Sequence, residues 1–266
     1  MDLSLFEQFF HISVEGSASP EYSAPVDKLI ADSAAMRDFL ERGGALVQAT
    51  GMELAVSYAG LAAYGLLALK QFAMSQYDRV LDLSPGNLEI RLEKHGDHAH
   101  IGYKIQQLRW NELPADACAR RAAVEAEWSR YLNEEFNPFI EGAAAAGGLK
   151  PDLIWNQFGA RAAFMIDYMR ERLPAGPELA RIEDDFALLA SLPAEAFNRK
   201  RKNPFDFVPV YVDSPYQPGG RIMIRSACCM YDRRENGVKC YNCPLLKESE
   251  RAARKIEIEA EIARKA

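Results

Sequence analysis

The sequence predicts an α+β protein, a helix-rich single globular unit with a small antiparallel sheet and a cysteine-rich segment near its C-terminal end. Helical periodicity dominates the first three quarters of the chain, two stretches within 88–105 alternate apolar and polar residues, and four of the five cysteines lie within 228–243. We expect a helix-rich domain over 1–204, with a β-hairpin near 88–105. Residues 205–266 are expected to form a strand-turn-strand, the cysteine segment and a terminal helix.

Several segments carry apolar residues at every third or fourth position, which is typical of helices packed on a core. The glycine pair at 43–44 is expected to end the first of them, Pro138 to interrupt the third, and Asp152 to cap the fourth. A glycine- and alanine-rich stretch, 142–148, separates the third from the fourth. The predicted helices cover residues 25–40, 52–77, 115–146, 152–172, 177–192 and 245–266.

Two other regions show the period of a β-strand. In 88–93 and again in 100–105, aliphatic or aromatic residues alternate with polar or small ones, which predicts an antiparallel hairpin. Aromatic and β-branched residues at 205–212, a turn over 214–220 and the stretch 221–225 predict a second strand pair. This second pair leads directly into the cysteines.

Charge and hydropathy limit the class of partner and compartment. A net charge of −6 and a pI near 5.4 argue against a general nucleic-acid binder or a binder of anionic membranes. Residues 1–7 show neither the basic nor the apolar region of a secretory signal, so we expect a cytoplasmic protein. The uncharged run 54–69 is shorter than the roughly 20 residues that span a bilayer. We interpret it as a core helix and expect no membrane span.

The cysteines form the most distinctive pattern, in which the adjacent pair Cys228-Cys229 is followed ten residues later by Cys240-x₂-Cys243 and a proline. In a reducing compartment, clustered thiols indicate metal or redox chemistry more than a structural disulfide. Four thiolates suit zinc or an iron–sulfur cluster. Zinc sites usually carry two Cys-x₂-Cys turns and this chain has one, whereas two irons accept ligands from different directions, so the spacing favours a cluster over zinc. We interpret the remaining Cys118 as a small, half-buried helix residue.

The stretches 221–232 and 239–245, which contain these cysteines, resemble the ferric siderophore reductase family of FhuF type. A weaker likeness lies in 153–160, which looks like the Leu-Trp-x-Asn helix shared by this family and the C-terminal region of siderophore synthetases. The resemblance implies a 2Fe–2S cluster and the reduction of ferric hydroxamate siderophores in the bacterial cytoplasm. The ligands that it implies are Cys228, Cys229, Cys240 and Cys243.

The implied chemistry is coherent, because hard oxygen donors hold Fe(III) far more tightly than Fe(II) and a 2Fe–2S centre carries one electron. The glycines at 142–148 follow a helix and match a dinucleotide fingerprint poorly, so an external electron donor is implied, such as a reductase, a ferredoxin or a small reductant. The leading hypothesis is a cytoplasmic 2Fe–2S ferric-siderophore reductase. The alternative is a non-catalytic module that binds zinc or serves as an iron–sulfur electron relay or sensor.

Five further residues are candidates for the substrate site or the surroundings of the cluster. Arg221 and Arg225 flank the strand before the cysteines, where they could steer an anionic chelate or donate hydrogen bonds near the sulfurs, although a solvated strand face explains them too. Tyr216, at the turn, could pack against a siderophore. The family likeness suggests Trp155 and Asn156 for the substrate cleft, whereas a buried tryptophan with a bridging asparagine explains them equally well.

Two other groups have a simpler interpretation. The basic run 199–202 could attract an acidic electron-transfer partner or an anionic siderophore, but a solvated loop is preferred. His95, His98 and His100 lie on the hairpin without a carboxylate–histidine pattern that would define a second metal site.

Overall fold

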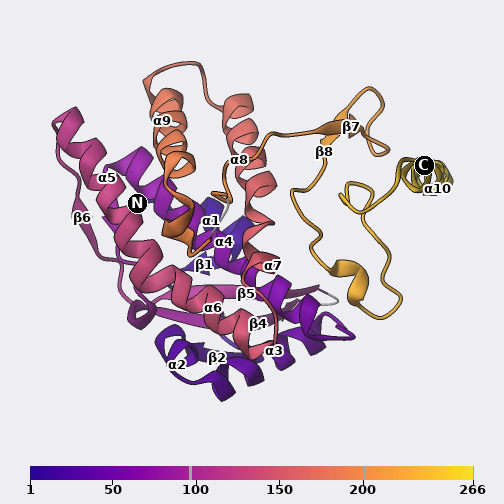
Figure 1. Cartoon of the computed structure of the whole chain (residues 1–266), viewed down its shortest axis with the longest axis horizontal. Coiled ribbons are helices and arrows are strands. Elements are labelled where there is room, and N and C mark those ends of the chain that lie inside the picture. Colours follow the sequence, from indigo (N-terminus) through magenta and orange to yellow (C-terminus); the bar gives the residue numbers. More distant parts are fainter. Residues whose placement is uncertain (96–97, 200–201, 266) are drawn as a thin grey trace.

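The computed structural model describes residues 1–95, 98–199 and 202–265, and it has the helix-rich α+β architecture that the sequence predicts. Figure 1 shows the helices and a small sheet packed into one body, while the C-terminal part of the chain, in yellow, lies along one side of it.

A four-stranded sheet with the strand order β1-β5-β4-β2 contains the predicted hairpin. β4 (Leu88–His95) and β5 (His98–Ile105) pair antiparallel over their whole length, which confirms the hairpin. β1 (Ile12–Ser13) pairs parallel with β5, and β2 (Tyr22–Pro25) pairs antiparallel with β4. These two edge strands are not predictable from the sequence, because so few residues carry no clear period.

Short elements complete the main body. α1 (Ser4–Phe10) precedes β1, and the 3₁₀ turn η1 (Pro85–Asn87) precedes β4. β3 (Arg79–Leu81) and β6 (Trp110–Glu112) form a separate antiparallel pair. This pair was also not predicted, for the same reason.

The first predicted helix is divided into α2 (Val26–Ala31) and α3 (Ser33–Leu46). Asp32 separates them, because its backbone is extended and its carboxylate accepts hydrogen bonds from the N–H groups of the first turn of α3. The predicted end at the glycine pair 43–44 was wrong as well. Both glycines lie inside α3, where a Cβ on Gly44 would come within 3.0 Å of the Cβ of Ala55, so glycine permits the close approach of the two helices.

α4 (Met52–Tyr77) is the central helix and has the predicted bounds. Within the described ranges it is the one helix whose length and composition would allow it to cross a membrane. Most of its apolar stretch is buried inside the fold, as in the core helix of a globular protein. Its buried face also carries polar groups, including Ser57 and Lys70, whose side chains are bonded to neighbouring elements.

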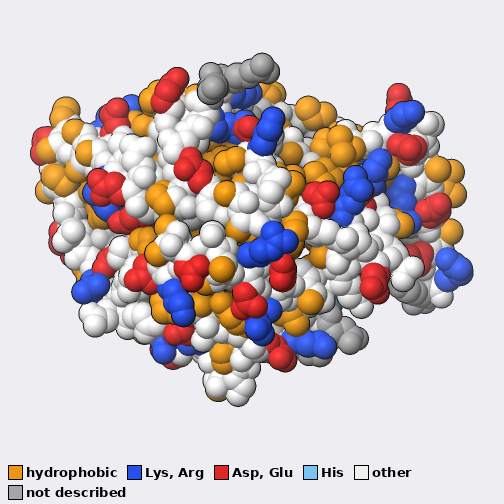
Figure 2. Space-filling model, turned by 60° about the horizontal axis from the view of Figure 1, so that its bottom comes forward, with side chains coloured by type: hydrophobic (Ala, Val, Ile, Leu, Met, Phe, Trp, Pro, Cys, Tyr) orange, Lys and Arg blue, Asp and Glu red, His pale blue; other side chains and the backbone are white. Residues whose placement is uncertain are grey.

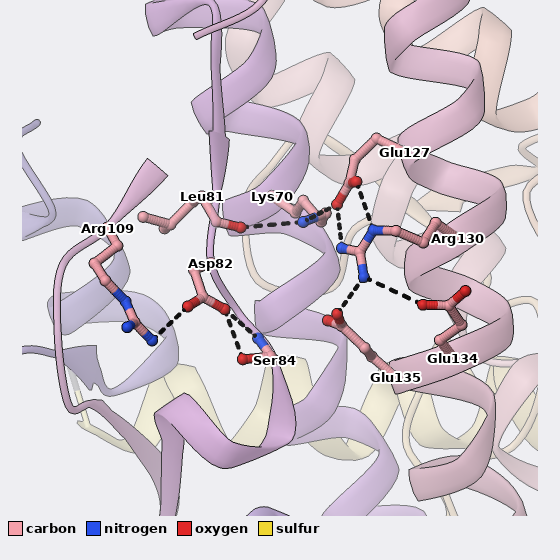
Figure 3. Close-up of polar contacts among 9 residues, drawn as sticks. All are labelled: Lys70, Leu81, Asp82, Ser84, Arg109, Glu127, Arg130, Glu134 and Glu135. Atoms are coloured by element: carbon pink, nitrogen blue, oxygen red, sulfur yellow. Dashed lines mark hydrogen bonds and ion pairs between the residues drawn. The ribbon is translucent and has the colours of Figure 1, made fainter. Parts of the chain in front are cut away.

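Lys70 is fully buried, and α5 (Ala117–Tyr131) supplies its counter-charge. Its Nζ atom lies 2.6 Å from Oε1 of Glu127 and donates a hydrogen bond to the carbonyl of Leu81 at 3.1 Å. Figure 3 shows that Arg130 donates to the same carboxylate. Burial lowers the pKa of Lys70 while Glu127 raises it. Because a buried charge without a partner is strongly destabilising, this cluster ties α4 to α5.

The predicted interruption near Pro138 takes the form of a π-helical segment and not of a break in the chain of helical turns. α5 runs without a break into the π-helical segment η2 (Leu132–Phe136) and α6 (Asn137–Ala146). The proline is accommodated because it occupies the first turn of α6 and follows the wider π turn. α6 also takes up most of the glycine- and alanine-rich stretch, so that the connection to the next helix is shorter than expected.

The predicted helix 152–172 consists of two helices, α7 (Asp152–Trp155) and α8 (Phe158–Arg172). Asp152 does not cap α7, because Pro151 occupies the cap position and no side chain bonds there. The carboxylate of Asp152 instead lies 3.1 Å from the guanidinium of Arg199.

The second predicted strand pair forms only in part. β7 (Tyr211–Asp213) and β8 (Arg221–Met223) pair antiparallel, whereas 205–210 joins no strand because Phe205 is buried in the core and Pro209 has no N–H to donate. The terminal helix α10 (Glu248–Lys265) begins three residues later than predicted. The remaining elements are α9 (Pro177–Ser191), which was predicted, and the 3₁₀ turns η3 (Ala194–Phe197) and η4 (Tyr231–Arg233).

Candidate metal centre

The cysteine segment is attached to the helical body on both sides of its adjacent cysteines. The buried hydroxyl of Ser57, on α4, donates a hydrogen bond of 2.7 Å to the carbonyl of Cys229. The same hydroxyl lies 3.1 Å from Nε2 of Gln157, in the connection between α7 and α8. The N–H of Ala160, on α8, donates to the hydroxyl of Ser226 at 3.1 Å. The position of Cys229 is therefore determined by α4 and α8.

The chain after the adjacent cysteines is held by the connection between α3 and α4. The N–H and the hydroxyl of Thr50 both donate to the carbonyl of Arg233 at 2.9 Å. The N–H of Glu235 donates to the carbonyl of Gln48, also at 2.9 Å. Met230 has a φ of +57°, which lets the chain reverse into η4 directly after the cysteine pair.

The Cys-x₂-Cys turn is closed by a hydrogen bond of 3.0 Å from the N–H of Cys243 to the carbonyl of Cys240. Asn242 joins this turn to the chain that enters the site. Its side chain donates to the carbonyl of Met223 at 3.0 Å, and its carbonyl accepts from the N–H of Arg225 at 3.0 Å. The two halves of the cysteine motif are thereby brought side by side.

Arg251, on α10, holds the same turn from the other side. Its guanidinium donates to the carbonyls of Tyr241 and Cys243, the latter at 3.0 Å, and to that of Leu246 at 3.4 Å. Hydrogen bonds from a charged donor are stronger than neutral ones. The terminal helix is thus part of the support of the site.

The four thiols form two interacting pairs, Cys229 with Cys240 and Cys228 with Cys243. A hydrogen bond from the Cys240 side chain, with a further contribution from the positive charge of Arg225, lowers the pKa of Cys229 to about 6. The same hydrogen bond, together with burial, raises the pKa of Cys240. Burial and the neighbouring Cys243 raise the pKa of Cys228 to about 12. Cys229 is therefore the thiol most readily ionised, which is the form that binds metal.

Backbone N–H groups point at the sulfurs. The N–H of Met230 lies 3.4 Å from Sγ of Cys228, and the N–H of Tyr231 bonds to Cys229. The thiol of Cys228 also faces Oδ1 of Asp232 at 3.7 Å. Hydrogen bonds from N–H groups to sulfur stabilise thiolate and are one means by which proteins set the potential of an iron–sulfur cluster.

The donor set fits a binuclear cluster. The side chains of Cys229 and Cys240 interact, as do those of Cys228 and Cys243, and Cys243 also acts on Cys240. A 2Fe–2S cluster is held by four thiolates, which is the number of thiols gathered here. Cys228, Cys229 and Cys243 are buried and Cys240 is partly exposed, so the four sulfurs lie at the edge of the protein interior.

Residues 225–245 match the family model described as FhuF 2Fe-2S C-terminal domain. This segment is similar to the FhuF-type 2Fe–2S domain, and it is called the FhuF-type domain below. The match contains all four clustered cysteines and indicates a 2Fe–2S cluster as the cofactor, which confirms the predicted resemblance and cofactor. The FhuF-type domain is a small part of the chain. No curated protein and no solved structure matches the sequence.

Two hollows open between the FhuF-type domain and the helical body, with volumes of about 500 and about 770 Å³. Cys229 lines both of them, and Cys240 lines the smaller one. Both hollows also share Arg161, Arg225 and the apolar side chains of Phe9, Phe10 and Leu61. A bulky ligand in either hollow would therefore lie against the same edge of the cysteine site.

The candidate residues outside the cysteines are not all brought to this place. Arg225 lines both hollows and Arg221 lines the larger one. Tyr216 is exposed and lines neither. Trp155 is 1 % exposed, within an aromatic cluster of the core, and Asn156 accepts a hydrogen bond of 2.7 Å from Arg199. The buried tryptophan with a bridging asparagine, which was the alternative interpretation, is the arrangement observed.

The remaining sequence candidates lie outside the cysteine site. Cys118 is exposed on α5, where half-burial was expected, because this stretch of the helix faces solvent. His100 packs against His11 with ring centroids 3.9 Å apart. In the basic run, Arg199 is paired with Asp152, and Lys202 lies 3.4 Å from Asp206.

Three residues named from the sequence lie outside what the structure describes. These are Lys200 and Arg201 and, for its side chain, His95.

Several residues of the site were not found from the sequence. Ser57 lies in an apolar helix, Gln157 and Arg161 follow the tryptophan motif, and Arg251 is one of many charges on the terminal helix. No local pattern distinguishes them from ordinary helix residues. Asn242, inside the Cys-x₂-Cys turn, had a usable signal, because asparagine in a turn often bonds to nearby backbone groups.

Proposed function

We propose that this protein is a cytoplasmic ferric-siderophore reductase in which Cys228, Cys229, Cys240 and Cys243 hold the 2Fe–2S cluster. The observation that supports it best is the position of the Cys229–Cys240 pair, since Cys229 lines hollows of about 500 and about 770 Å³ and Cys240 lines the smaller of them. Neither of these hollows is lined by the Cys228–Cys243 pair, whose cysteines are both buried. One edge of the cluster site is thus open to a bulky reactant and the other is enclosed.

The hollows have a suitable size and lining. Small-molecule sites commonly measure about 300–1,000 Å³ and combine apolar walls with a few polar groups. When bound, the 2Fe–2S cluster supplies one electron. That electron reduces Fe(III) of the chelate to Fe(II), and no bond forms between chelate and protein. Since siderophore oxygens hold Fe(II) weakly, iron then leaves and the chelator stays intact.

Two kinds of group around the sulfurs stabilise negative charge at the cluster site. Arg225 places a positive charge beside Cys229 and Cys240 and stabilises their thiolate forms. The N–H groups of Met230 and Tyr231 bond to the sulfurs of the adjacent cysteines and thereby stabilise added negative charge. The substrate in this proposal is a ferric siderophore of hydroxamate type. The electron comes from an external donor, which is a reductase, a ferredoxin or a small reductant.

The cluster itself is tested by absorption and EPR spectroscopy of protein purified without air. A red-brown protein with an S = 1/2 signal after dithionite is expected. A colourless, EPR-silent protein with stoichiometric zinc would leave a zinc-binding module instead.

The reaction is tested by mixing pre-reduced protein with ferrioxamine B or ferrichrome in a stopped-flow instrument, with a ferrous trap present. Reoxidation of the cluster and formation of the trapped Fe(II) are expected at matching rates, one iron for each cluster. A reduced cluster that neither chelate reoxidises would contradict the reductase proposal and leave an electron relay or sensor.

A further inference from the structure

The segment around the cysteines has a charge opposite to that of the whole chain. Residues 221–255 contain nine Lys or Arg and four Asp or Glu, whereas the chain has a net charge of −6. An oxidised 2Fe–2S cluster with four thiolates carries a charge of about −2, so the segment stays basic when the cluster is bound. A basic region in an acidic protein attracts an acidic partner and repels it elsewhere.

Two exposed cations of this segment, Arg233 and Lys247, form no ion pair with a carboxylate of the described residues. Asp232, beside Arg233, faces the thiol of Cys228. On the face shown in Figure 2, positive and negative side chains are interspersed, so the charges there offset one another. Arg233 and Lys247 are therefore free to attract the negative charges of a partner.

Apolar side chains are exposed at both ends of the Cys-x₂-Cys turn. Val238 is 58 % exposed and precedes Cys240 by two residues, while Leu245 is 57 % exposed and follows Cys243 by two residues. Two residues of chain span at most about 7 Å, so both side chains lie close to the ligands. In the described chain, eight of the twelve exposed large apolar side chains lie within 208–262, which indicates a protein contact in this part of the molecule.

These exposed side chains are separate from the two hollows. The outer surface of the cysteine segment is formed by Arg233, Val238, Leu245 and Lys247. None of these four residues lines either hollow. Figure 1 shows the segment along one side of the helical body, and the hollows open between the segment and that body. A partner bound to the outer surface therefore leaves both hollows free for a chelate.

We propose that the outer surface is the docking site of an acidic one-electron carrier protein, which supplies the electron to the cluster. The inference rests on the proposed function, since it names a partner of the same site. The carrier loses one electron and one Fe(III) of the cluster becomes Fe(II), with no bond made or broken and no proton moved. Redox partners commonly meet through small interfaces, where complementary charges speed the encounter and apolar contacts exclude water.

The test uses the holoprotein and flavodoxin, an acidic one-electron carrier whose flavin changes colour when it loses an electron. The variant is Arg233→Glu/Lys247→Glu. The matched control is Arg121→Glu/Lys150→Glu, which changes the net charge by the same amount on the helical body. Arg121, on α5, and Lys150, before α7, are also exposed and form no ion pair within the described ranges.

Two quantities are measured at low ionic strength. They are the second-order rate constant for reduction of the cluster by reduced flavodoxin, and the affinity of oxidised flavodoxin for the oxidised holoprotein, where no electron moves. Arg233→Glu/Lys247→Glu should lower both by about tenfold, because two attractions become repulsions. In about 0.5 M salt the loss should shrink to less than about threefold, since salt screens exposed charges. The control should change both by less than about twofold.

The apolar part of the surface is tested by Leu245→Gln. This change should lower the affinity for oxidised flavodoxin by about fivefold at either ionic strength, because burial of apolar area depends little on salt screening. An affinity that stays within about twofold of the wild type would remove Leu245 from the docking surface and contradict the inference.

Other outcomes would overturn the inference. A wild type that flavodoxin neither binds nor reduces has no such docking site, and equal losses in both double variants would mean that net charge alone sets the rate. Slower reduction with unchanged affinity and a shifted midpoint potential would show that the charges act on the cluster. A wild-type dimer that Arg233→Glu/Lys247→Glu separates, with flavodoxin binding unchanged, would assign the outer surface to a second copy of the chain.

Failure of the proposed function is distinguishable from failure of this inference. If no ferric chelate reoxidises the reduced wild type, the proposed reductase activity fails. Binding of oxidised flavodoxin involves no chelate, so its loss in Arg233→Glu/Lys247→Glu and its retention in the control would still establish the docking surface.

Discussion

The hydroxyl of Ser57 gives the most direct test of how the fold holds the cysteine site. Ser57 is 0 % exposed in the second turn of α4, and it donates a hydrogen bond of 2.7 Å to the carbonyl of Cys229. Ser57→Ala removes this donor without adding bulk and without disfavouring the helix. The carbonyl of Cys229 then loses that donor, while Gln157 keeps its bond of 2.6 Å to the carbonyl of Leu153.

The size of the effect follows from this geometry. A buried acceptor left without its donor costs about 1–3 kcal/mol, and the better helix propensity of alanine returns at most about 0.5 kcal/mol. Because the acceptor belongs to Cys229 itself, the loss weakens the docking of the FhuF-type domain on α4. A net loss of about 1.4 kcal/mol corresponds to a factor of ten. We therefore expect the cluster to be lost about ten times faster than in the wild type.

The assay follows the visible absorbance of the anaerobic holoprotein after a strong iron chelator is added. Ser75→Ala is the matched control, because Ser75 lies on the same helix, is 2 % exposed and donates to Oδ2 of Asp185 at 2.9 Å. Both variants should lose a similar free energy of unfolding in urea. Only Ser57→Ala should bleach faster. Equal bleaching of the two variants, or of Ser57→Ala and the wild type, would refute the claim that α4 positions the cysteine segment.

Further predictions concern the ligands, the terminal helix and the core. Cys243→Ser should abolish or destabilise the cluster, as measured by the visible spectrum and by the EPR signal of the reduced protein. Cys118→Ser should leave both signals unchanged. A spectrum lost in the Cys118 variant would show that the ligand set is wrong. Arg251→Met should free the Cys-x₂-Cys turn from α10, because it removes charged donors from three carbonyls. Amide hydrogen exchange in the turn should become about tenfold faster. Arg254→Met, which breaks an exposed ion pair, should leave this exchange rate unchanged. Lys70→Met should lower the free energy of unfolding in urea by about 3 kcal/mol, since it breaks a buried pair although Glu127 keeps Arg130; a loss below about 1 kcal/mol would mean that this pair does not stabilise the core.

The periodicity of apolar residues was sufficient to predict an element and its type where that element is long and regular. The apolar run within 52–77 identified α4 with its bounds, and the alternation in 88–105 identified the hairpin. The same periodicity did not predict where helices end or are interrupted. Asp32, Pro138 and Asp152 each have properties that suit a cap or a break, but which of these roles a residue takes depends on whether neighbouring groups offer it a better partner, as Arg199 does for Asp152.

In the cysteine site, too, some features were predictable from the sequence and others only from the tertiary structure. Its four thiols lie within 228–243, and their number, type and spacing favoured a cluster over zinc before any contact was known. The resemblance of the same residues to the FhuF-type family implied the 2Fe–2S cofactor. Contacts between distant parts of the chain depend on the packing of whole helices and leave no periodic signal. For that reason only the tertiary structure revealed how the thiols pair, that Ser57 holds the carbonyl of Cys229, and that Arg161 lies beside Arg225 at the open edge of the site.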